Sequence, residues 1–291
     1  MTAATGTPVT IPAFTPAARW LATAAALSAF FTSIFTSSLT NVAIPHVMGA
    51  FGVGQSQAQF LSTAFLAMNT TGLLASSWTI AKIGQRNTFF LVLFVFAGGS
   101  VLSFIAPTLE TMIVGRVLQG FAAGVLQPLV MMVLFQVFPL EKRGLAMGMF
   151  SMGVTVALGL GPSLAGITID AFSWRTIFLI PIPASLLAGL LGLFFLPAEE
   201  QKTEPGKFDF LGFGLVNAFV FGWFTMLGNG QKWGWASDDW AMLATFTLMC
   251  GIAFIYSQKR ANASLLDLSL FQNGRFVNAL ACSFFFGFGN F

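Results

Sequence analysis

A charged side chain lies inside a long apolar run near the middle of this sequence. Arg116 is followed by Gln119 and Gly120 at the third and fourth positions, so the three lie on or beside one helix face. Gly124 continues a Gly-x-x-x-Gly spacing that lets two helices approach closely in lipid. A guanidinium group there can bias the local field and favour the charged form of a partner acid. Snorkelling of Arg116 to the outer headgroups is the alternative, but Gln119 and the two glycines favour a bundle interior.

A second candidate site lies in the next apolar run, where Gly161 and Pro162 interrupt a stripe of small residues. The stripe continues to Gly166, and Pro162 removes one backbone donor and bends the helix. Two interpretations need the same residues: ordinary tight packing, or a contact that slides or rocks between two halves of a bundle. The small residues of the stripe at fourfold spacing are Gly153, Ala157, Gly161 and Ala165.

Composition sets the class of protein that must position these groups. Of 291 residues, 56% are hydrophobic and 8% are charged, against roughly a quarter charged in soluble domains. The sequence therefore predicts an all-α polytopic membrane protein. The basic residues form no stripe, so no nucleic-acid partner is expected. One histidine and two scattered cysteines predict neither a metal site nor a cofactor, and no nucleophile–base pair suggests an enzyme.

The apolar runs predict nine membrane helices. The first is expected to end at Pro45, and polar loops are expected at 82–87 and 228–239. From residue 276 to 291 a helix reaches roughly 24 Å, short of a bilayer core of about 30 Å, which predicts a fragment or one half of a larger protein. The expected helices are 20–44, 59–81, 88–106, 111–138, 144–169, 174–196, 210–227, 240–256 and 276–291.

Four regions follow from these helices. Residues 1–16 are expected to be disordered, and residues 17–196 to form a six-helix bundle. Residues 197–258 are expected to hold a polar cytoplasmic linker and two extra helices, and residues 259–291 a loop and the incomplete start of another bundle.

Basic residues predict the orientation. A cytoplasmic N-terminus leaves only Arg175 and Lys232 at the outer face, whereas the opposite orientation would invert this bias. The loop with Lys82, Gly84 and Arg86 then faces the cytoplasm. The basic residues placed inside are Arg19, Lys82, Arg86, Lys142, Arg143, Lys202, Lys207, Lys259, Arg260 and Arg275.

Uncharged polar residues also occur at membrane depth. Asn41, Asn69 and Gln127 are expected either to face a cavity or to bond to neighbouring helices.

Several motifs together resemble the major facilitator superfamily, in particular its fourteen-helix drug/proton antiporter branch of the EmrB/QacA type. Gly115-Arg116-x-x-Gln119-Gly120 is similar to the fourth-helix motif, whose arginine is associated with proton coupling. The remaining similar stretches are Gly161-Pro162-x-x-Ala165-Gly166, Asn41-Val42-Ala43-Ile44-Pro45, Trp174-Arg175-x-Ile177-Phe178, Gly230-Gln231-x-x-Gly234-Trp235 and Leu266-Asp267-Leu268-x-Leu270-Phe271.

The resemblance implies an N-terminal six-helix bundle, two linker helices and the start of a second bundle, in an inner (plasma) membrane. It implies a proton-coupled exporter of drugs or other small molecules that works by alternating access. The implied roles are proton coupling for Arg116, Gln119 and Gly120, and conformational switching for Gly161, Pro162 and Gly166. The implied partners are a small-molecule substrate, protons, the bilayer, a C-terminal half and a periplasmic adaptor.

Two positions depart from the family pattern. Thr36 stands where the first-helix motif usually has an acid, and Ala81 where the cytoplasmic loop motif usually has Asp. Thr36 joins the candidate cavity-lining residues, and proton transfer would need a carboxylate from elsewhere. Two alternatives therefore stay open beside the exporter: a non-transporting fragment or half-transporter that needs a partner chain, and an exporter of one metabolite or siderophore, neutral or anionic.

Overall fold

The computed structural model describes residues 15–196, 208–260, 265–266 and 268–289, with side chains described up to residue 285. Every regular element in these ranges is a helix. The chain divides into two compact units, Met1–Glu204 and Pro205–Phe291, which are described separately. The expectation of disorder before residue 15 and that of a polar linker at 197–207 lie outside the described residues.

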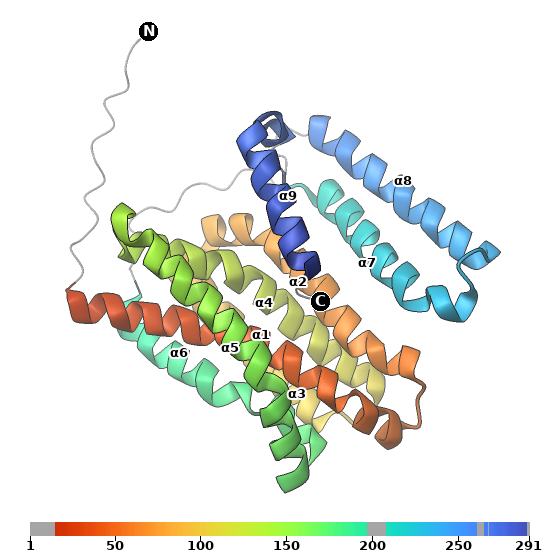
Figure 1. Ribbon diagram of the computed structural model, residues 1–291, viewed down its shortest axis with the longest axis horizontal. Helices are drawn as coiled ribbons and strands as arrows, with labels where there is room; N and C mark the ends of the chain where they lie inside the picture. The colour runs from red at the N-terminus through yellow and green to blue at the C-terminus, as the bar shows by residue number, and fades with distance from the viewer. Residues whose placement is uncertain (1–14, 197–207, 261–264, 267, 290–291) are drawn as a thin grey trace. The chain divides into compact units, whose positions relative to one another are not determined.

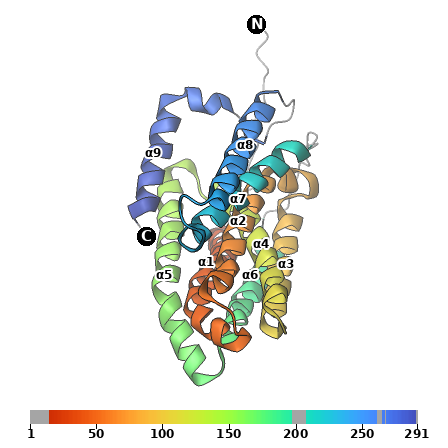
Figure 2. The ribbon, with the colours of Figure 1, turned by 90° about the vertical axis from the view of Figure 1, so that its right-hand side faces the viewer.

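The first unit contains six long helices that pack side by side (Figure 1). Helix α4 contacts α1, α2, α3 and α5, while α1 also packs against α5 and α6 (Figure 2). The elements are α1 (Pro16–Phe51), α2 (Gln55–Ile83), α3 (Gln85–Ile105), α4 (Leu109–Val137), the 3-10 turn η1 (Leu140–Lys142), α5 (Arg143–Ala171), η2 (Trp174–Phe178) and α6 (Pro181–Phe195).

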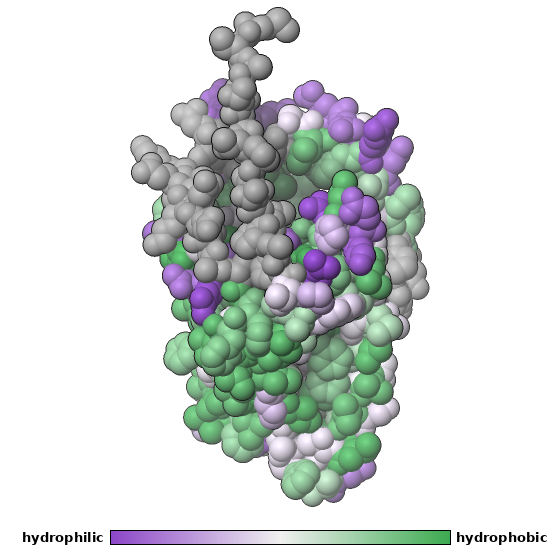
Figure 3. Space-filling view, turned by 90° about the vertical axis from the view of Figure 1, so that its left-hand side faces the viewer, coloured by the Kyte–Doolittle hydropathy of each residue, from purple (hydrophilic) through white to green (hydrophobic). Residues whose placement is uncertain are grey.

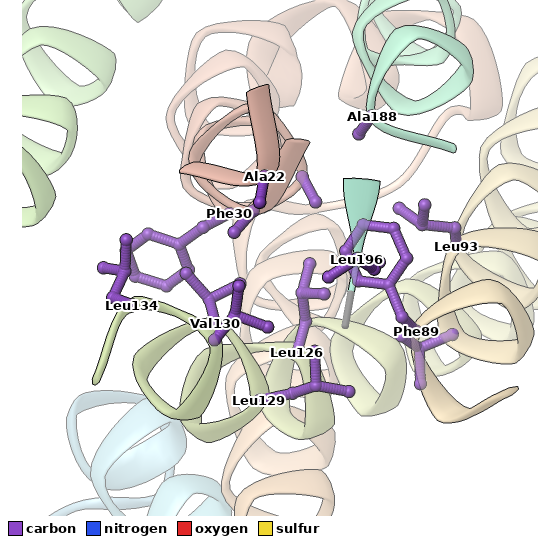
Figure 4. Packing of buried hydrophobic residues seen from close by; sticks show 14 of the residues in the cluster. Ala22, Phe30, Phe89, Leu93, Leu126, Leu129, Val130, Leu134, Ala188 and Leu196 are labelled. Carbon is purple, nitrogen blue, oxygen red and sulfur yellow. The ribbon is translucent and has the colours of Figure 1, made fainter. Parts of the chain in front are cut away.

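Hydrophobic side chains from several helices meet around α4. Phe30 of α1, Phe89 of α3 and Leu129 of α4 belong to one buried cluster (Figure 4). The Phe30 ring stacks on Phe150 of α5 with ring centroids 4.2 Å apart, which ties α5 to the cluster. The core of this unit therefore holds α4, with Arg116, between α1, α2 and α3.

The second unit is built on a pair of packed helices, α7 (Phe210–Trp233) and α8 (Asp238–Arg260), followed by η3 (Leu268–Gln272) and α9 (Gly274–Gly289). Gln258 links three parts of this unit: its amide donates to Asp209, which caps α7, and its oxygen accepts from the backbone of Leu266. Side-chain hydrogen bonds thus connect the start of α7 to the end of α8.

Three predicted boundaries are wrong. Pro45 lies inside α1, which continues to Phe51 and is capped by Gly52, where φ is +64°. The predicted loop 82–87 shrinks to Gly84, with φ +88°, so Lys82 and Arg86 belong to α2 and α3. Helix α7 continues to Trp233, well into the predicted loop that begins at 228. Proline and polar residues are tolerated in these helices because neighbouring helices supply packing and hydrogen bonds.

Much of the outer surface is apolar. Among the described residues, seven helices are long and apolar enough to cross a membrane, namely α1, α3, α4, α5, α6, α7 and α8, with α5 and α6 counted together with the 3-10 turns before them. Large side chains such as Phe94, Phe194 and Leu186 are exposed, and hydrophobic residues dominate the lower part of the face in Figure 3. This surface suits lipid rather than water. Nine spans were predicted, and α2 and α9 are the two that are not among these seven. Helix α2 is rich in Ser, Thr and Gln, and the described part of α9 is only 16 residues long.

Candidate functional site

The guanidinium group of Arg116 is completely buried among α2, α3 and α4. Its Nε donates to the Leu61 carbonyl oxygen of α2 at 3.2 Å, and its Nη1 donates to Gln119 Oε1 at 2.8 Å. Gln119 Nε2 in turn donates to Ser100 Oγ of α3 at 2.7 Å. The predicted bundle interior is confirmed, and snorkelling is excluded for this conformation. One chain of hydrogen bonds joins three helices through a single charge.

The positive charge is balanced by dipoles and an aromatic ring. The Arg116 guanidinium carbon lies 4.2 Å from the centroid of the Phe65 ring. Arg116 Nη2 has no hydrogen-bond partner among the described residues. The described acids of the first unit, Glu110, Glu141 and Asp170, are exposed near helix ends. A buried cation with an open donor can attract an anion or stabilise a carboxylate that approaches it.

Glycines let α2 and α4 approach closely enough for this network. A methyl group on Gly120 would lie 2.3 Å from the Phe65 carbonyl oxygen, and one on Gly124 would lie 2.0 Å from that of Asn69. Gly72 of α2 makes a similar close contact from the other side, since a methyl group on it would lie 2.2 Å from the Phe121 carbonyl oxygen. The backbones are therefore in direct contact along this seam, as the Gly-x-x-x-Gly spacing predicts.

The second candidate site lies where α5 meets α1. Gly161 is buried, and a methyl group on it would lie 2.2 Å from Ser38 Oγ of α1. Pro162 lies inside α5 with an exposed ring, while Gly166 has open space where a methyl would be. Three of the four stripe residues, Ala157, Gly161 and Ala165, are buried, whereas Gly153 has open space where a methyl group would be. Whether the α1–α5 contact slides stays a prediction.

The predicted gate residues hold the short α2–α3 connection. Arg86 Nη2 donates to the Leu193 carbonyl oxygen of α6, and Lys82 Nζ lies 4.4 Å from the centroid of the Trp78 ring. Gly84 is needed for its positive φ. Arg86 thus connects α3 to α6, whereas the contact between Lys82 and Trp78 lies within α2.

The uncharged polar candidates do not share one environment. Thr36 is buried, and its hydroxyl donates to the Thr32 carbonyl oxygen of its own helix. Asn41 is exposed and accepts a hydrogen bond from Ser62 of α2, while Asn69 and Gln127 are half-buried. Cavity lining by Thr36, Asn41, Asn69 and Gln127 therefore stays a prediction.

Sequence reasoning missed several partners. Ser100 and Phe65 complete the Arg116 network, and neither has a motif around it. Gln85 of α3 and Gln136 of α4 exchange two amide hydrogen bonds of 3.1 and 2.9 Å. Arg175 Nη1 donates to the carbonyl oxygens of Phe104 and Ala106 at the end of α3. The only available signal was a polar residue in an apolar run, which gives no partner.

Comparison with known proteins decides the family. The model of the Major Facilitator Superfamily matches residues 26–291, nearly the whole chain. The chain belongs to the Major Facilitator Superfamily. It is a multi-pass membrane protein of this transporter family, and the resemblance drawn from its motifs is confirmed.

Curated members of the superfamily cover most of this chain. The multidrug export protein EmrB of Haemophilus influenzae (strain ATCC 51907 / DSM 11121 / KW20 / Rd) is 31% identical over 264 residues, which is 90% of this chain and 52% of that protein. The fatty acid resistance protein FarB of Neisseria gonorrhoeae is 32% identical over 257 residues, 88% of this chain and 51% of that protein. The chain spans about half the length of the curated relatives it matches.

The fold agrees with solved superfamily structures. A crystal structure of the peptide transporter POT in complex with sulfate superimposes with a TM-score of 0.61 at 14% sequence identity, covering 83% of this chain and 53% of that one. At this identity the likeness concerns the fold alone.

Proposed function

We propose that this chain is part of a secondary transporter that exports a small, largely apolar molecule from the cell by alternating access, driven by the proton gradient. The observation that carries the proposal is the fully buried Arg116, held by α2 and α3 at membrane depth. A charge in that position is costly and is retained where it serves an ion or substrate pathway. EmrB, a multidrug export protein, matches 90% of the chain, which supports the choice of cargo class.

Arg116 acts in this proposal as a fixed positive charge. Its open Nη2 donor favours the deprotonated form of a carboxylate that comes near it, and protonation of that carboxylate releases the attraction. The described acids of the first unit are exposed near helix ends. The responding acid is therefore proposed to come from the cargo or from a part of the transporter outside these six helices.

The test is efflux from cells that make the whole transporter. Cells are loaded with a lipophilic dye, and dye loss is followed with and without a protonophore at constant ATP. Export that stops when the proton gradient collapses supports the proposal. Export that continues at the same rate sinks the coupling claim.

A second candidate is an exporter of an anionic or neutral metabolite, such as a siderophore. Two observations favour it: Thr36 is a buried, uncharged side chain, and the one buried charge of the first unit's described part is positive. FarB, a fatty acid resistance protein, matches 88% of the chain. Competition between a lipophilic cation and a long-chain carboxylate separates the two candidates, because only the preferred cargo slows export of the other.

The proposed setting is the inner membrane with a cytoplasmic N-terminus. Lys82, Arg86, Lys142 and Arg143 lie at the ends of α2, α3 and α5 that would face the cytoplasm. The proposed partners are protons, the exported small molecule, a C-terminal half and a periplasmic adaptor.

A further inference from the structure

The proline inside α5 leaves one backbone carbonyl without its usual donor. In a regular α-helix the N–H of residue 162 would bond to the carbonyl of Leu158, but Pro162 has no N–H. An unpaired backbone carbonyl within a membrane is unfavourable, because lipid offers no hydrogen bond in exchange. The Leu158 oxygen therefore needs a donor from outside the α5 backbone ladder.

Ser38 of α1 supplies such a donor. Its Oγ donates to the Leu158 carbonyl oxygen at 3.4 Å, across 120 positions of sequence. Other buried hydroxyls of α1 behave differently, since they donate to carbonyls of α1 itself. These hydroxyls belong to Thr23, Thr32, Ser33, Thr36 and Thr40.

Gly161 makes room for this contact. A methyl group on Gly161 would lie 2.2 Å from Ser38 Oγ and 2.6 Å from Ser38 Cβ, so no larger residue fits there without moving α1. Gly161 is buried and Ser38 is only 9% exposed. The glycine opens the space, the proline frees the carbonyl, and the serine fills the space and bonds to the carbonyl.

We propose that Ser38 is a positioning residue for the α5 break, because its hydroxyl takes over the hydrogen bond that Pro162 cannot make. The bond holds the interrupted turn of α5 against α1 in this conformation. Any rearrangement of the α1–α5 contact during transport must break or replace it. The effect on transport rests on the proposed function, whereas the effect on the α1–α5 contact does not.

A double-mutant cycle tests the proposal. Ser38→Ala removes the donor, and Pro162→Ala restores a backbone N–H for the Leu158 carbonyl. In the protein with Pro162, Ser38→Ala should lower the thermal midpoint of the purified, lipid-embedded protein by about 2–4 °C, roughly the effect of one lost hydrogen bond in a chain of this size. In the Pro162→Ala background the same change should have little effect. Equal shifts in both backgrounds would overturn the proposal.

Ser33→Ala is the matched control, because Ser33 is also buried on α1 but donates to Phe30 of its own helix. Its effect should be the same with Pro162 and with Pro162→Ala. If Pro162→Ala does not accumulate, Pro162→Gly restores the same N–H with a different side chain. Non-additivity at Ser33 as large as at Ser38 would also overturn the proposal.

Export kinetics give a second test of the role of Ser38. Ser38→Ala should change the maximal export rate while the KM for cargo stays near that of the unmodified protein, and Pro162→Ala should abolish this difference. A changed KM at an unchanged maximal rate would contradict a positioning role. If the unmodified protein exports nothing, the proposed function fails, and the thermal cycle still decides the Ser38 bond.

Discussion

At the scale of single residues, Gln119 connects the Arg116 charge to the rest of the bundle. It accepts from Arg116 Nη1 and donates to Ser100 Oγ, and it is completely buried. Because the Gln119 amide is neutral, it leaves the guanidinium group without a counter-charge, so the net positive charge can act on other groups. A carboxylate at the same position would neutralise it.

We expect Gln119→Glu to preserve or raise the thermal midpoint but to abolish gradient-driven export. The new carboxylate would pair with a guanidinium that is already buried without a counter-charge, so their attraction offsets the cost of burying the second charge. Thermal unfolding and efflux are measured on the same preparations. Ser100→Ala is the control, because it removes the far partner of Gln119 and leaves the charge of Arg116 intact. Full export by Gln119→Glu would show that the free charge of Arg116 is not needed.

The placement of Arg116 and Gln119 could be predicted from spacing, since positions three apart on a helix meet. Their neighbours could not. Leu61, Phe65 and Ser100 lie on other helices, and their contribution depends on the register of α2 and α3 against α4. Nothing local to Ser100 distinguishes it from the other serines of the chain.

At the scale of elements, the α2–α4 seam is set by glycines. Gly124 faces the Asn69 carbonyl oxygen at 2.0 Å from its hypothetical methyl group, whereas Gly148 of α5 has nothing within 4 Å. The two positions have the same residue type in helices of similar character. Alanine substitutions at Gly124 and Gly148 therefore separate the effect of close packing from the effect of helix propensity.

Gly124→Ala should destabilise the protein by about 1–2 kcal/mol. Overpacking against a backbone costs about 1–3 kcal/mol, and the better helix propensity of alanine offsets up to about 1 kcal/mol. Gly148→Ala should be neutral or slightly stabilising. Thermal or denaturant unfolding of both variants checks this prediction. Equal effects at the two positions would refute the claim that close packing between α2 and α4 requires Gly124.

Helix ends were the least predictable part of the fold. Pro45 and the stretch from Gly228 carry signals that usually end helices, yet α1 and α7 run through them. Their neighbours decide the outcome, because a membrane helix that stops early exposes backbone groups to lipid. At Gly84, by contrast, a single positive φ makes the whole turn, so a loop of six residues was not needed.

At the scale of the whole molecule, orientation follows from the ends of α5. Glu141 precedes α5 and Asp170 lies near its far end, and both are exposed. Single cysteines at these positions, in a Cys250→Ala and Cys282→Ala background, can be labelled with an impermeant maleimide in right-side-out vesicles. Asp170→Cys should react at once, and Glu141→Cys only after permeabilisation. The reverse pattern would place the N-terminus outside.

The family and the all-helical membrane architecture could be predicted from composition and motif order, because neither depends on knowledge of contacts. Function lies at this scale, because alternating access needs elements that move relative to one another.

The central claim is that the buried charge of Arg116 couples export to the proton gradient. The most direct measurement is cargo movement in proteoliposomes with an imposed pH gradient, comparing the whole transporter with its Arg116→Ala variant at equal reconstitution. We predict gradient-driven transport by the unmodified protein and a loss of at least about tenfold in the variant, equivalent to about 1.4 kcal/mol. Unchanged gradient-driven transport by Arg116→Ala would contradict the account and leave Arg116 as a purely structural link between α2, α3 and α4.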